Sequence, residues 1–317
     1  MRRVAQSQTQ CPVESQEVLC CCLCGTAEKV ILYRGRAPSR TSDTDIWRCT
    51  SPTHGDFTQI VRCPRCRLVY QDPRDPLPVI EGGYRMVVDE VYLHEAASRV
   101  STFEKSLERI EALRATGRLL DVGCYTGVFI SVASRSGWDC IGIEPSTWAA
   151  DYARGQGLRV LNHTLREANL ESGLFDVITM WDVIEHLPDP VEEIRECYRL
   201  LKPGGLLCLS TMNVESAFAR LLGKRWPWYM RMHLYYFSPL TISRLLEMAG
   251  FSVRSISRHK RIVSVKYLLQ KIGCYSSFAE ACLAMPLKLL GMSERQVTVD
   301  FGDIMDVIAE KPAMSST

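Results

Sequence analysis

No stretch of the sequence is hydrophobic over the roughly 18 residues that a membrane-spanning helix needs. The N-terminus, "MRRVAQSQTQCPVESQEV", also lacks a hydrophobic signal core. The charge is not of one sign, because 38 Lys and Arg nearly balance 36 Asp and Glu. These absences argue against a membrane protein and against a broad nucleic-acid-binding surface. We therefore expect a cytoplasmic protein whose cysteines are reduced and not paired in disulfides.

The composition is that of a globular protein with a proper core, with 46% hydrophobic and 23% charged residues. At roughly 150 residues per domain, 317 residues predict one large domain or a large domain with a smaller attachment. The sequence shows no internal repeat and no low-complexity stretch.

Eight of the 14 cysteines fall before residue 67, which indicates a metal site in the N-terminal segment. "CCCLCGT" contains the pair Cys21 and Cys24, and "VRCPRCRLVY" contains the pair Cys63 and Cys66. Two such pairs form a closed tetrahedral site typical of structural Zn²⁺, and two short strands between them, 29–35 and 57–63, favour a zinc ribbon. The alternatives are a cysteine-rich segment without metal, or a ligand set that includes Cys20, Cys22, Cys49 or His54.

From residue 98 onward, helical and strand patterns alternate. "QDPRDPLP" precedes this region and marks a domain boundary. The alternation predicts an α/β fold, Rossmann-like, with a doubly wound and mostly parallel sheet of seven strands and an antiparallel edge strand over 299–312. The expected helices cover 98–113, 127–137, 147–157, 189–201 and 238–250, and the expected strands 118–122, 139–144, 158–162, 175–180, 204–211 and 251–257.

In an open sheet of this kind, the ligand lies beyond the carboxyl ends of the strands. Each of four successive strands ends in residues suited to a ligand, and Glu144 stands where a carboxylate can accept hydrogen bonds from two ribose hydroxyls. Asp121 or Asp182 could instead cap a helix, and Glu144 could be a surface charge. The candidate cofactor-binding residues are Asp121, Gly123, Cys124, Tyr125, Gly127, Glu144, Pro145, Thr164, Leu165, Trp181 and Asp182.

The first of these turns, "DVGCYTG", lacks the glycines that a nicotinamide or flavin site requires. Tyr125 and Val128 stand where the second and third glycines of that pattern would be. The turn does resemble the glycine-rich turn of the class I S-adenosylmethionine-dependent methyltransferases, and "IGIEPS", "FDVITMWDVIEHLPDP" and "LLKPGGLLCLST" are similar to later motifs of that family. The resemblance covers residues 99 to about 258 and the last strand.

The resemblance implies S-adenosylmethionine as the cofactor. It implies that Asp121, Gly123 and Gly127 surround the methionine part and that Glu144 holds the ribose. Leu165 and Trp181 would lie against the adenine or the sulfonium, with Asp182 near the amino acid end. Tyr125 replaces the family's middle glycine: it would be strained by roughly 1–3 kcal/mol at positive φ, or would project over the pocket at negative φ. We interpret it as an altered pocket wall.

The segment "GKRWPWYMRMHLYYFSP", residues 223–239, is unusually rich in aromatic residues. It would either grip the acceptor or form a packed lid. Its His233 is the candidate general base, and Glu185 and His186 are further catalytic candidates that could instead cap a local turn. The N-terminal cysteines and the core together resemble a bacterial methyltransferase subgroup that includes deoxysugar C-methyltransferases with four-cysteine zinc domains. Of the Tyr-x-Glu-His segment of those enzymes, only His233 is kept, which argues against C-methylation of a ketosugar.

We therefore expect an N-terminal tail at 1–19, a zinc-ribbon-like domain at 20–75 and a methyltransferase domain at 76–317 with an acceptor-side lid at about 214–240. The function predicted is methyl transfer from S-adenosylmethionine to a small-molecule acceptor, such as a sugar or glycan precursor, without nucleic acid or membrane partners. The alternative is a zinc-ribbon binding module with a vestigial cofactor site that acts on a protein or RNA. The methylated atom and the oligomeric state stay open.

Overall fold

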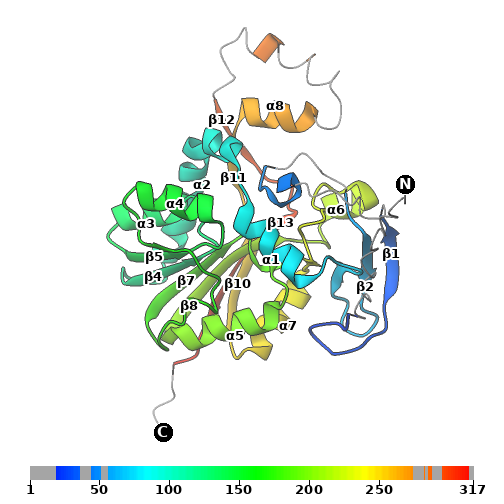
Figure 1. The fold of residues 1–317 in the computed structure, drawn as a ribbon, viewed down its shortest axis with the longest axis horizontal. Coiled ribbons are helices and arrows are strands. Elements are labelled where there is room, and N and C mark those ends of the chain that lie inside the picture. Colours follow the sequence, from blue (N-terminus) through cyan, green and yellow to red (C-terminus); the bar gives the residue numbers. More distant parts are fainter. Residues whose placement is uncertain are drawn as a thin grey trace, which may run out of the picture.

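The structure is a computed structural model of the full chain, and it describes residues 19–35, 44–50, 56–273, 282, 285–287 and 295–313. Its centre is a seven-stranded sheet with the order β10-β13-β8-β7-β4-β5-β6 (Figure 1). Five adjacent strands, from β8 to the β6 edge, run parallel, as the sequence predicts. They are β4 (Arg118–Val122), β5 (Asp139–Ile143), β6 (Val160–Leu161), β7 (Phe175–Trp181) and β8 (Leu201–Met212).

Helices cover both faces of this sheet. Because successive side chains of a strand point to opposite faces, Leu119 of β4 enters one hydrophobic cluster and Leu120 the other. The Leu119 cluster is closed by α2 (Ala96–Glu111), α3 (Val128–Arg135) and α4 (Thr147–Gly155), and the Leu120 cluster by α5 (Pro190–Leu200) and α7 (Pro239–Met248). All five helices were predicted from the sequence, and Asp189 and Ser238 cap α5 and α7 with their side chains.

The last strand, β13 (Ile304–Glu310), is antiparallel as predicted but is not at the edge of the sheet. It lies between β8 and β10 (Ser252–Arg258), so the prediction of an edge position was wrong. The physical reason is burial: six of the seven residues of β13 are buried, whereas none of the seven residues of β10 is buried and four are exposed. An exposed, polar strand is better suited to the edge of a sheet than a buried one.

The N-terminal segment forms a second, antiparallel sheet with the order β1-β2-β3-β9, beside the large sheet at the right of Figure 1. Its strands are β1 (Val30–Arg34), β2 (Gln59–Arg62), β3 (Val69–Gln71) and β9 (Tyr235–Tyr236). β9 belongs to the predicted acceptor-side segment, and it pairs with β3 through Tyr70 and Tyr235. The cysteine-containing segment is therefore joined directly to the segment that carries His233.

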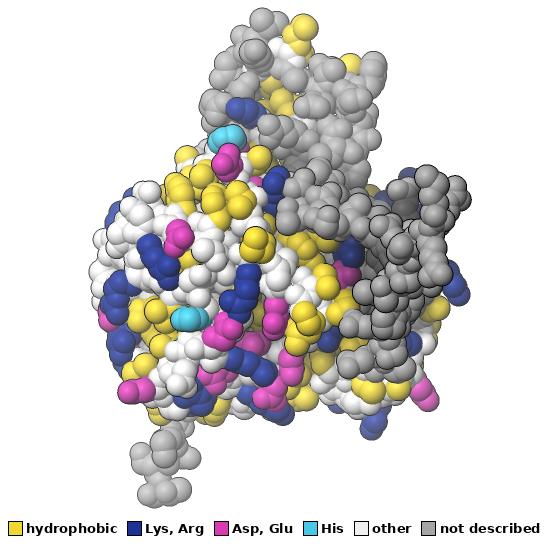
Figure 2. All heavy atoms as spheres, viewed as in Figure 1, with side chains coloured by type: hydrophobic (Ala, Val, Ile, Leu, Met, Phe, Trp, Pro, Cys, Tyr) yellow, Lys and Arg dark blue, Asp and Glu magenta, His cyan; other side chains and the backbone are white. Residues whose placement is uncertain are grey.

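The remaining elements surround these two sheets. The helix α1 (Leu77–Met86) follows β3. A two-stranded antiparallel sheet of β11 (Arg261–Ser264) and β12 (Gln296–Val299) stands with α8 (Val265–Gly273) at the top of Figure 1. The short helices are α6 (Ala217–Leu222), η1 (Thr44–Trp47), η2 (Glu90–Glu95), η3 (Ile184–His186) and η4 (Gly223–Arg225). On the face drawn in Figure 2, basic and acidic side chains are intermixed, as the near-neutral net charge predicts.

Candidate active site

The carboxyl ends of β4, β5 and β7 lie side by side, because β4 pairs in parallel with both other strands. This edge brings together the predicted cofactor residues Asp121, Glu144 and Asp182. The turn after β4 needs its glycines: Gly123 and Gly127 have φ values of 69° and 78°. A Cβ on Gly123 would lie 2.6 Å from the Val183 side chain, so there is no space for a side chain at this position. The positive φ would also strain any residue other than glycine.

Tyr125 has a φ of 48°, which is the strained alternative of the two that the sequence left open. Its amide donates a hydrogen bond of 2.8 Å to Oε2 of Glu144. Its ring contacts Tyr92 edge-on, with centroids 4.5 Å apart, and lies 6.0 Å from the Trp148 ring. The left-handed conformation thus points the amide at the carboxylate, and the side chain becomes part of an aromatic wall.

Glu144 is a buried carboxylate held by the main chain. Oε2 accepts from Tyr125 and Oε1 accepts from the Ser146 amide at 2.7 Å. Burial raises its pKa to about 7 despite these two hydrogen bonds. Asp121 accepts from the Thr179 hydroxyl at 2.6 Å, and burial, with a smaller contribution from the Glu144 charge, raises its pKa to about 8. Because the charges of Asp121 and Glu144 interact, a ligand that brings a cation or hydroxyl donors would favour their ionised forms.

Arg99, on α2, was not predicted from the sequence. Its guanidinium lies 3.7 Å from the centroid of the Tyr92 ring, and its Nε is buried with no hydrogen-bond partner among the described residues. Tyr125 Oη and Thr126 Oγ1 are likewise buried without partners there. Unpaired polar atoms at a strand edge are suited to a ligand's carboxylate and amino groups. The sequence did contain a signal for this residue. Arg99 is four residues before Phe103, so the two side chains lie on the same face of the helix as the buried residues.

Asn162 follows β6 and connects the end of β6 to the end of β5. Its side-chain amide donates to the carbonyl oxygens of Glu144 and Pro145, at 2.9 and 3.0 Å. Thr164 donates through its amide and hydroxyl to Glu167, and Leu165 is buried in the cluster on the α5 side of the sheet.

Trp181 lies apart from Leu165, with which the sequence analysis grouped it. Its ring lies on the opposite face from Leu165, with centroids 5.2 Å from Phe129 and 6.1 Å from Phe103. The ring is taken up by aromatic packing between the sheet and helices α2 and α3, so Leu165 and Trp181 do not share a surface. A cofactor contact of Trp181 stays a prediction, as does that of Asp182.

Asp182 also has a left-handed backbone, with a φ of 54°. Its Oδ1 accepts from the Ser210 hydroxyl at 2.9 Å, and its Oδ2 forms an ion pair with Arg261. Burial would raise the pKa of this carboxyl, but the charges of Arg261 and His259 outweigh it and lower the pKa. The pKa of Asp182 is thus shifted in the opposite direction from those of Asp121 and Glu144.

The three predicted catalytic residues meet. Glu185, His186 and His233 each have a side-chain oxygen or nitrogen within 4.8 Å of the others. Burial, with the nearby charge of Asp182, raises the pKa of Glu185 to about 8, and burial lowers the pKa of His186 to about 4. His186 is therefore neutral and weakly basic. The carboxylate and two imidazoles are also donors of the kind that a divalent cation can take.

The main chain holds His233 through Nδ1, which lies 2.8 Å from the Trp228 carbonyl oxygen. Because a carbonyl only accepts, this contact places the hydrogen of a neutral ring on Nδ1 and leaves Nε2 as the basic nitrogen. Gln71 of β3 fixes the loop by donating to the carbonyl oxygens of Met230, Arg231 and His233. Sequence analysis did not identify Gln71, which lies in the predicted linker.

Most of the aromatic segment is packed. Trp226, Tyr229, Tyr235, Tyr236 and Phe237 are all buried in the hydrophobic clusters. Trp228 is only partly buried, and its ring lies 6.2 Å from that of His233. Packing therefore accounts for most of the segment, whereas its role as a lid stays a prediction, and Trp228 is the more exposed aromatic residue of this group.

The four predicted metal ligands, Cys21, Cys24, Cys63 and Cys66, form a cluster whose sulfur atoms lie within 4.8 Å of one another. Zinc–sulfur bonds of about 2.3 Å require sulfur atoms about 3.8 Å apart in a tetrahedron, so the cluster fits a structural zinc ion. Burial opposes ionisation of Cys63, but hydrogen bonds from the Cys66 amide and the neighbouring thiols lower its pKa to about 7.

The other cysteines named as alternatives are not in this cluster. Cys20 and Cys49 are both exposed and lie outside the cluster. His54 lies outside the described residues. The described cysteines are all free.

We expect one zinc per chain in metal-replete protein, measured by elemental analysis. Cys63→Ser should release the ion and loosen the β1–β3 segment while the large sheet stays folded, because metal binding and folding of such a segment are coupled. Cys20→Ser, which changes an exposed cysteine outside the cluster, should retain the ion. A folded wild-type protein that binds no zinc would contradict the assignment.

Comparison with known proteins agrees with this geometry. Residues 92–256 match the family described as "Methyltransferase domain". The chain is 36% identical over 127 residues to a ubiquinone biosynthesis O-methyltransferase of Pectobacterium atrosepticum, and 29% identical over 154 residues to one of Aliivibrio fischeri. These matches cover 34% and 44% of this chain, and they span 53% and 66% of the two relatives. A SAM-dependent methyltransferase structure from Archaeoglobus fulgidus has 20% identity and a TM-score of 0.47, over 70% of this chain and all of that one.

The fold and the acidic strand edge define an α/β protein with a nucleotide-type cofactor site. The family match then makes the assignment specific: the chain belongs to the class I S-adenosylmethionine-dependent methyltransferases. Among the described residues, no helix is long and apolar enough to span a membrane.

Proposed function

We propose that the protein transfers a methyl group from S-adenosylmethionine to a small-molecule acceptor. The observation that carries the proposal is Glu144: a buried carboxylate at the end of β5, oriented by the amides of Tyr125 and Ser146. Its remaining lone pairs suit the two hydroxyls of a ribose. When bound, S-adenosylmethionine would supply a methyl group activated by a sulfonium. Glu144 would hold its ribose, and Asp121, Asp182 and Arg99 its amino-acid end.

The residues on the other side of Asp182 would act on the acceptor. Methyl transfer to a hydroxyl forms an O–C bond, breaks the S–C bond and requires the loss of the hydroxyl proton. Nε2 of His233 is the candidate acceptor of that proton, because Nδ1 is held by the Trp228 carbonyl. His186, with its lowered pKa, is a weaker base. The lid shields the site from water, since its aromatic side chains are packed.

We keep a sugar or glycan precursor as a candidate acceptor. The relatives above are named as O-methyltransferases of ubiquinone biosynthesis, which favours a hydroxyl as the methylated group. We further propose that residues 20–75 form a zinc-ribbon-like domain and 76–317 the methyltransferase domain, with a lid at about 214–240. The alternative, a binding module with a vestigial site, is less consistent with a site that keeps Asp121, Glu144 and Asp182.

The proposal is tested by calorimetry with S-adenosylmethionine and S-adenosylhomocysteine, followed by detection of S-adenosylhomocysteine formed when candidate acceptors are added. Binding of both ligands and acceptor-dependent turnover would support an enzyme. A chelator added to the turnover assay shows whether the Glu185 cluster needs a divalent cation. A wild-type protein that binds neither ligand would favour the binding-module alternative.

The affinity for S-adenosylmethionine should increase as the pH rises from 6 to 8. Without the cofactor, Asp121 and Glu144 have pKa values raised to about 8 and 7 and are partly protonated in this range. A cation and hydroxyl donors favour the ionised carboxylates, so binding releases protons. The dissociation constant should fall by up to about tenfold per pH unit for each proton released. Calorimetry in buffers of different ionisation enthalpy measures that release, and a pH-independent affinity would contradict the expectation.

A further inference from the structure

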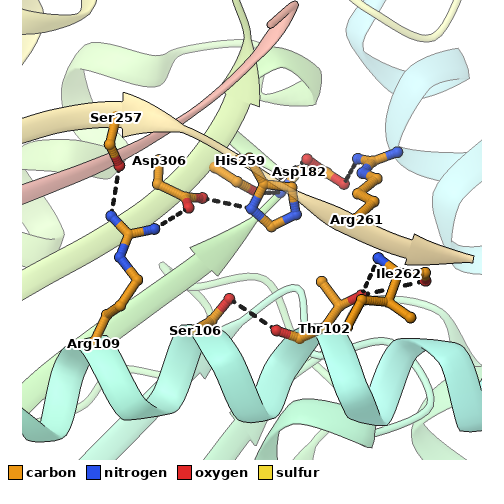
Figure 3. A network of polar contacts seen from close by, with 10 residues as sticks. Thr102, Ser106, Arg109, Asp182, Ser257, His259, Arg261, Ile262 and Asp306 are labelled. Atoms are coloured by element: carbon orange, nitrogen blue, oxygen red, sulfur yellow. Dashed lines mark hydrogen bonds and ion pairs between the residues drawn. The ribbon is translucent and has the colours of Figure 1, made fainter. Parts of the chain in front are cut away.

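Arg261 joins the cofactor edge to the acceptor side. It forms an ion pair with Oδ2 of Asp182 (Figure 3). The Ser210 hydroxyl donates to Oδ1, so both oxygens of this carboxylate have a partner. The pair is accessible: the side chains of Arg261 and Asp182 are 29% and 40% exposed. The left-handed backbone of Asp182, strained in a residue other than glycine, is the kind of conformation that occurs at functional sites.

The backbone that carries Arg261 is firmly anchored. On one side of it, Nδ1 of His259 lies 2.7 Å from Asp306, which also pairs with Arg109 of α2. On the other side, the Ile262 amide donates to the Thr102 hydroxyl at 2.9 Å. Figure 3 shows Arg261 between these two anchors, with its guanidinium turned toward Asp182. The backbone of Arg261 is therefore held independently of Asp182, so the side chain can change its partner while the backbone stays in place.

One face of the Arg261 guanidinium lies over Trp228, 5.2 Å from the ring centroid. Trp228 is itself fixed, because its Nε1 donates to Asp303 at 2.8 Å and its carbonyl oxygen holds His233. The charge of Arg261 also acts on Glu185. Arg261 thus stands between Asp182 and the catalytic candidates, stacked on the accessible aromatic residue of the lid.

The cofactor and Arg261 need the same carboxylate. The amino-acid end of S-adenosylmethionine carries an ammonium group, and Asp182 is the candidate for that end. A second cation on a carboxylate whose two oxygens are already used weakens its bond to Arg261. A guanidinium has five donors in a planar fork, which match a carboxylate or a phosphate.

We propose that Arg261 recognises an anionic group, carboxylate or phosphate, on the methyl acceptor, and that occupation of Asp182 by the cofactor's ammonium releases Arg261 for this role. This inference rests on the proposed function and names the class of acceptor. Cofactor and acceptor anion then favour each other's binding, because each removes a competitor for the other's partner.

The test measures the affinity for S-adenosylhomocysteine, which has the same amino-acid end, by calorimetry at constant ionic strength. The buffer contains chloride alone, or chloride partly replaced by inorganic phosphate or by benzoate. In the wild-type protein, at least one of the two anions should lower the dissociation constant by about fivefold or more. An effect of phosphate alone indicates a phosphorylated acceptor, and an effect of benzoate alone indicates a carboxylate.

Arg261→Gln should abolish the anion effect, and Arg261→Lys, which keeps the charge without the fork, should reduce it. Arg254→Gln should behave as wild type, because Arg254 is an exposed arginine of β10 that pairs with Glu310 of β13. An anion effect absent from the wild-type protein, or retained in Arg261→Gln, would overturn the proposal. S-adenosylhomocysteine that does not bind the wild-type protein in any buffer would instead contradict the proposed function.

Discussion

Glu144→Ala should weaken binding of S-adenosylhomocysteine by well over tenfold. The substitution removes two hydrogen bonds from the ribose hydroxyls to a carboxylate, and each charged hydrogen bond contributes roughly 1.5–3 kcal/mol. It also leaves the amides of Tyr125 and Ser146 without their acceptor. Each buried amide without a partner costs about 1–3 kcal/mol, so the free energy of unfolding should fall as well. Calorimetry and thermal unfolding measure the two effects separately.

Glu144→Gln is the matched variant for this experiment. Its side-chain carbonyl can still accept from one of the two amides, so it should lose less stability than Glu144→Ala and still bind the cofactor poorly. Glu171→Ala changes an exposed glutamate outside the candidate site, so it should change neither the affinity for S-adenosylhomocysteine nor the stability. Unchanged affinity in Glu144→Gln and Glu144→Ala would refute the ribose role and leave Glu144 as a support for the turn.

Periodic patterns predicted the large sheet because they reflect local burial. β4, β5 and β7 are short apolar runs, and each is followed by a helix with a cap or a glycine turn. Their residue ranges and their order along the chain therefore follow from the sequence. The same reasoning placed Asp121, Glu144 and Asp182 together, since the ends of parallel strands share an edge. It failed for β13, where burial on both faces determines the neighbours and cannot be seen in one strand alone.

The residues that sequence analysis missed act across long separations. Gln71 holds the His233 loop from 162 residues away, through a strand pairing of β3 with β9 that no local pattern encodes. Arg99 reaches the cofactor edge from a helix whose pattern indicated only a buried stripe. Tyr125 shows the opposite case. Its position was evident from the missing glycine, but whether its backbone was strained depended on the hydrogen bond to Glu144.

His233→Ala should lower turnover by about 10²–10⁴-fold with cofactor affinity unchanged, because removal of a general base affects only the proton transfer. His233 is 4% exposed, so its replacement also disturbs packing. His233→Asn separates the two effects, since its side-chain amide can still donate to the Trp228 carbonyl while the basic nitrogen is gone. Turnover is measured as S-adenosylhomocysteine formed with an acceptor that the wild-type protein methylates, and affinity by calorimetry. His163→Ala, an exposed histidine, is the control. Full activity in His233→Asn, or a loss that follows cofactor affinity, would make His233 a structural residue of the lid and leave alignment by Arg261 and Trp228 as the site's main contribution to the acceptor.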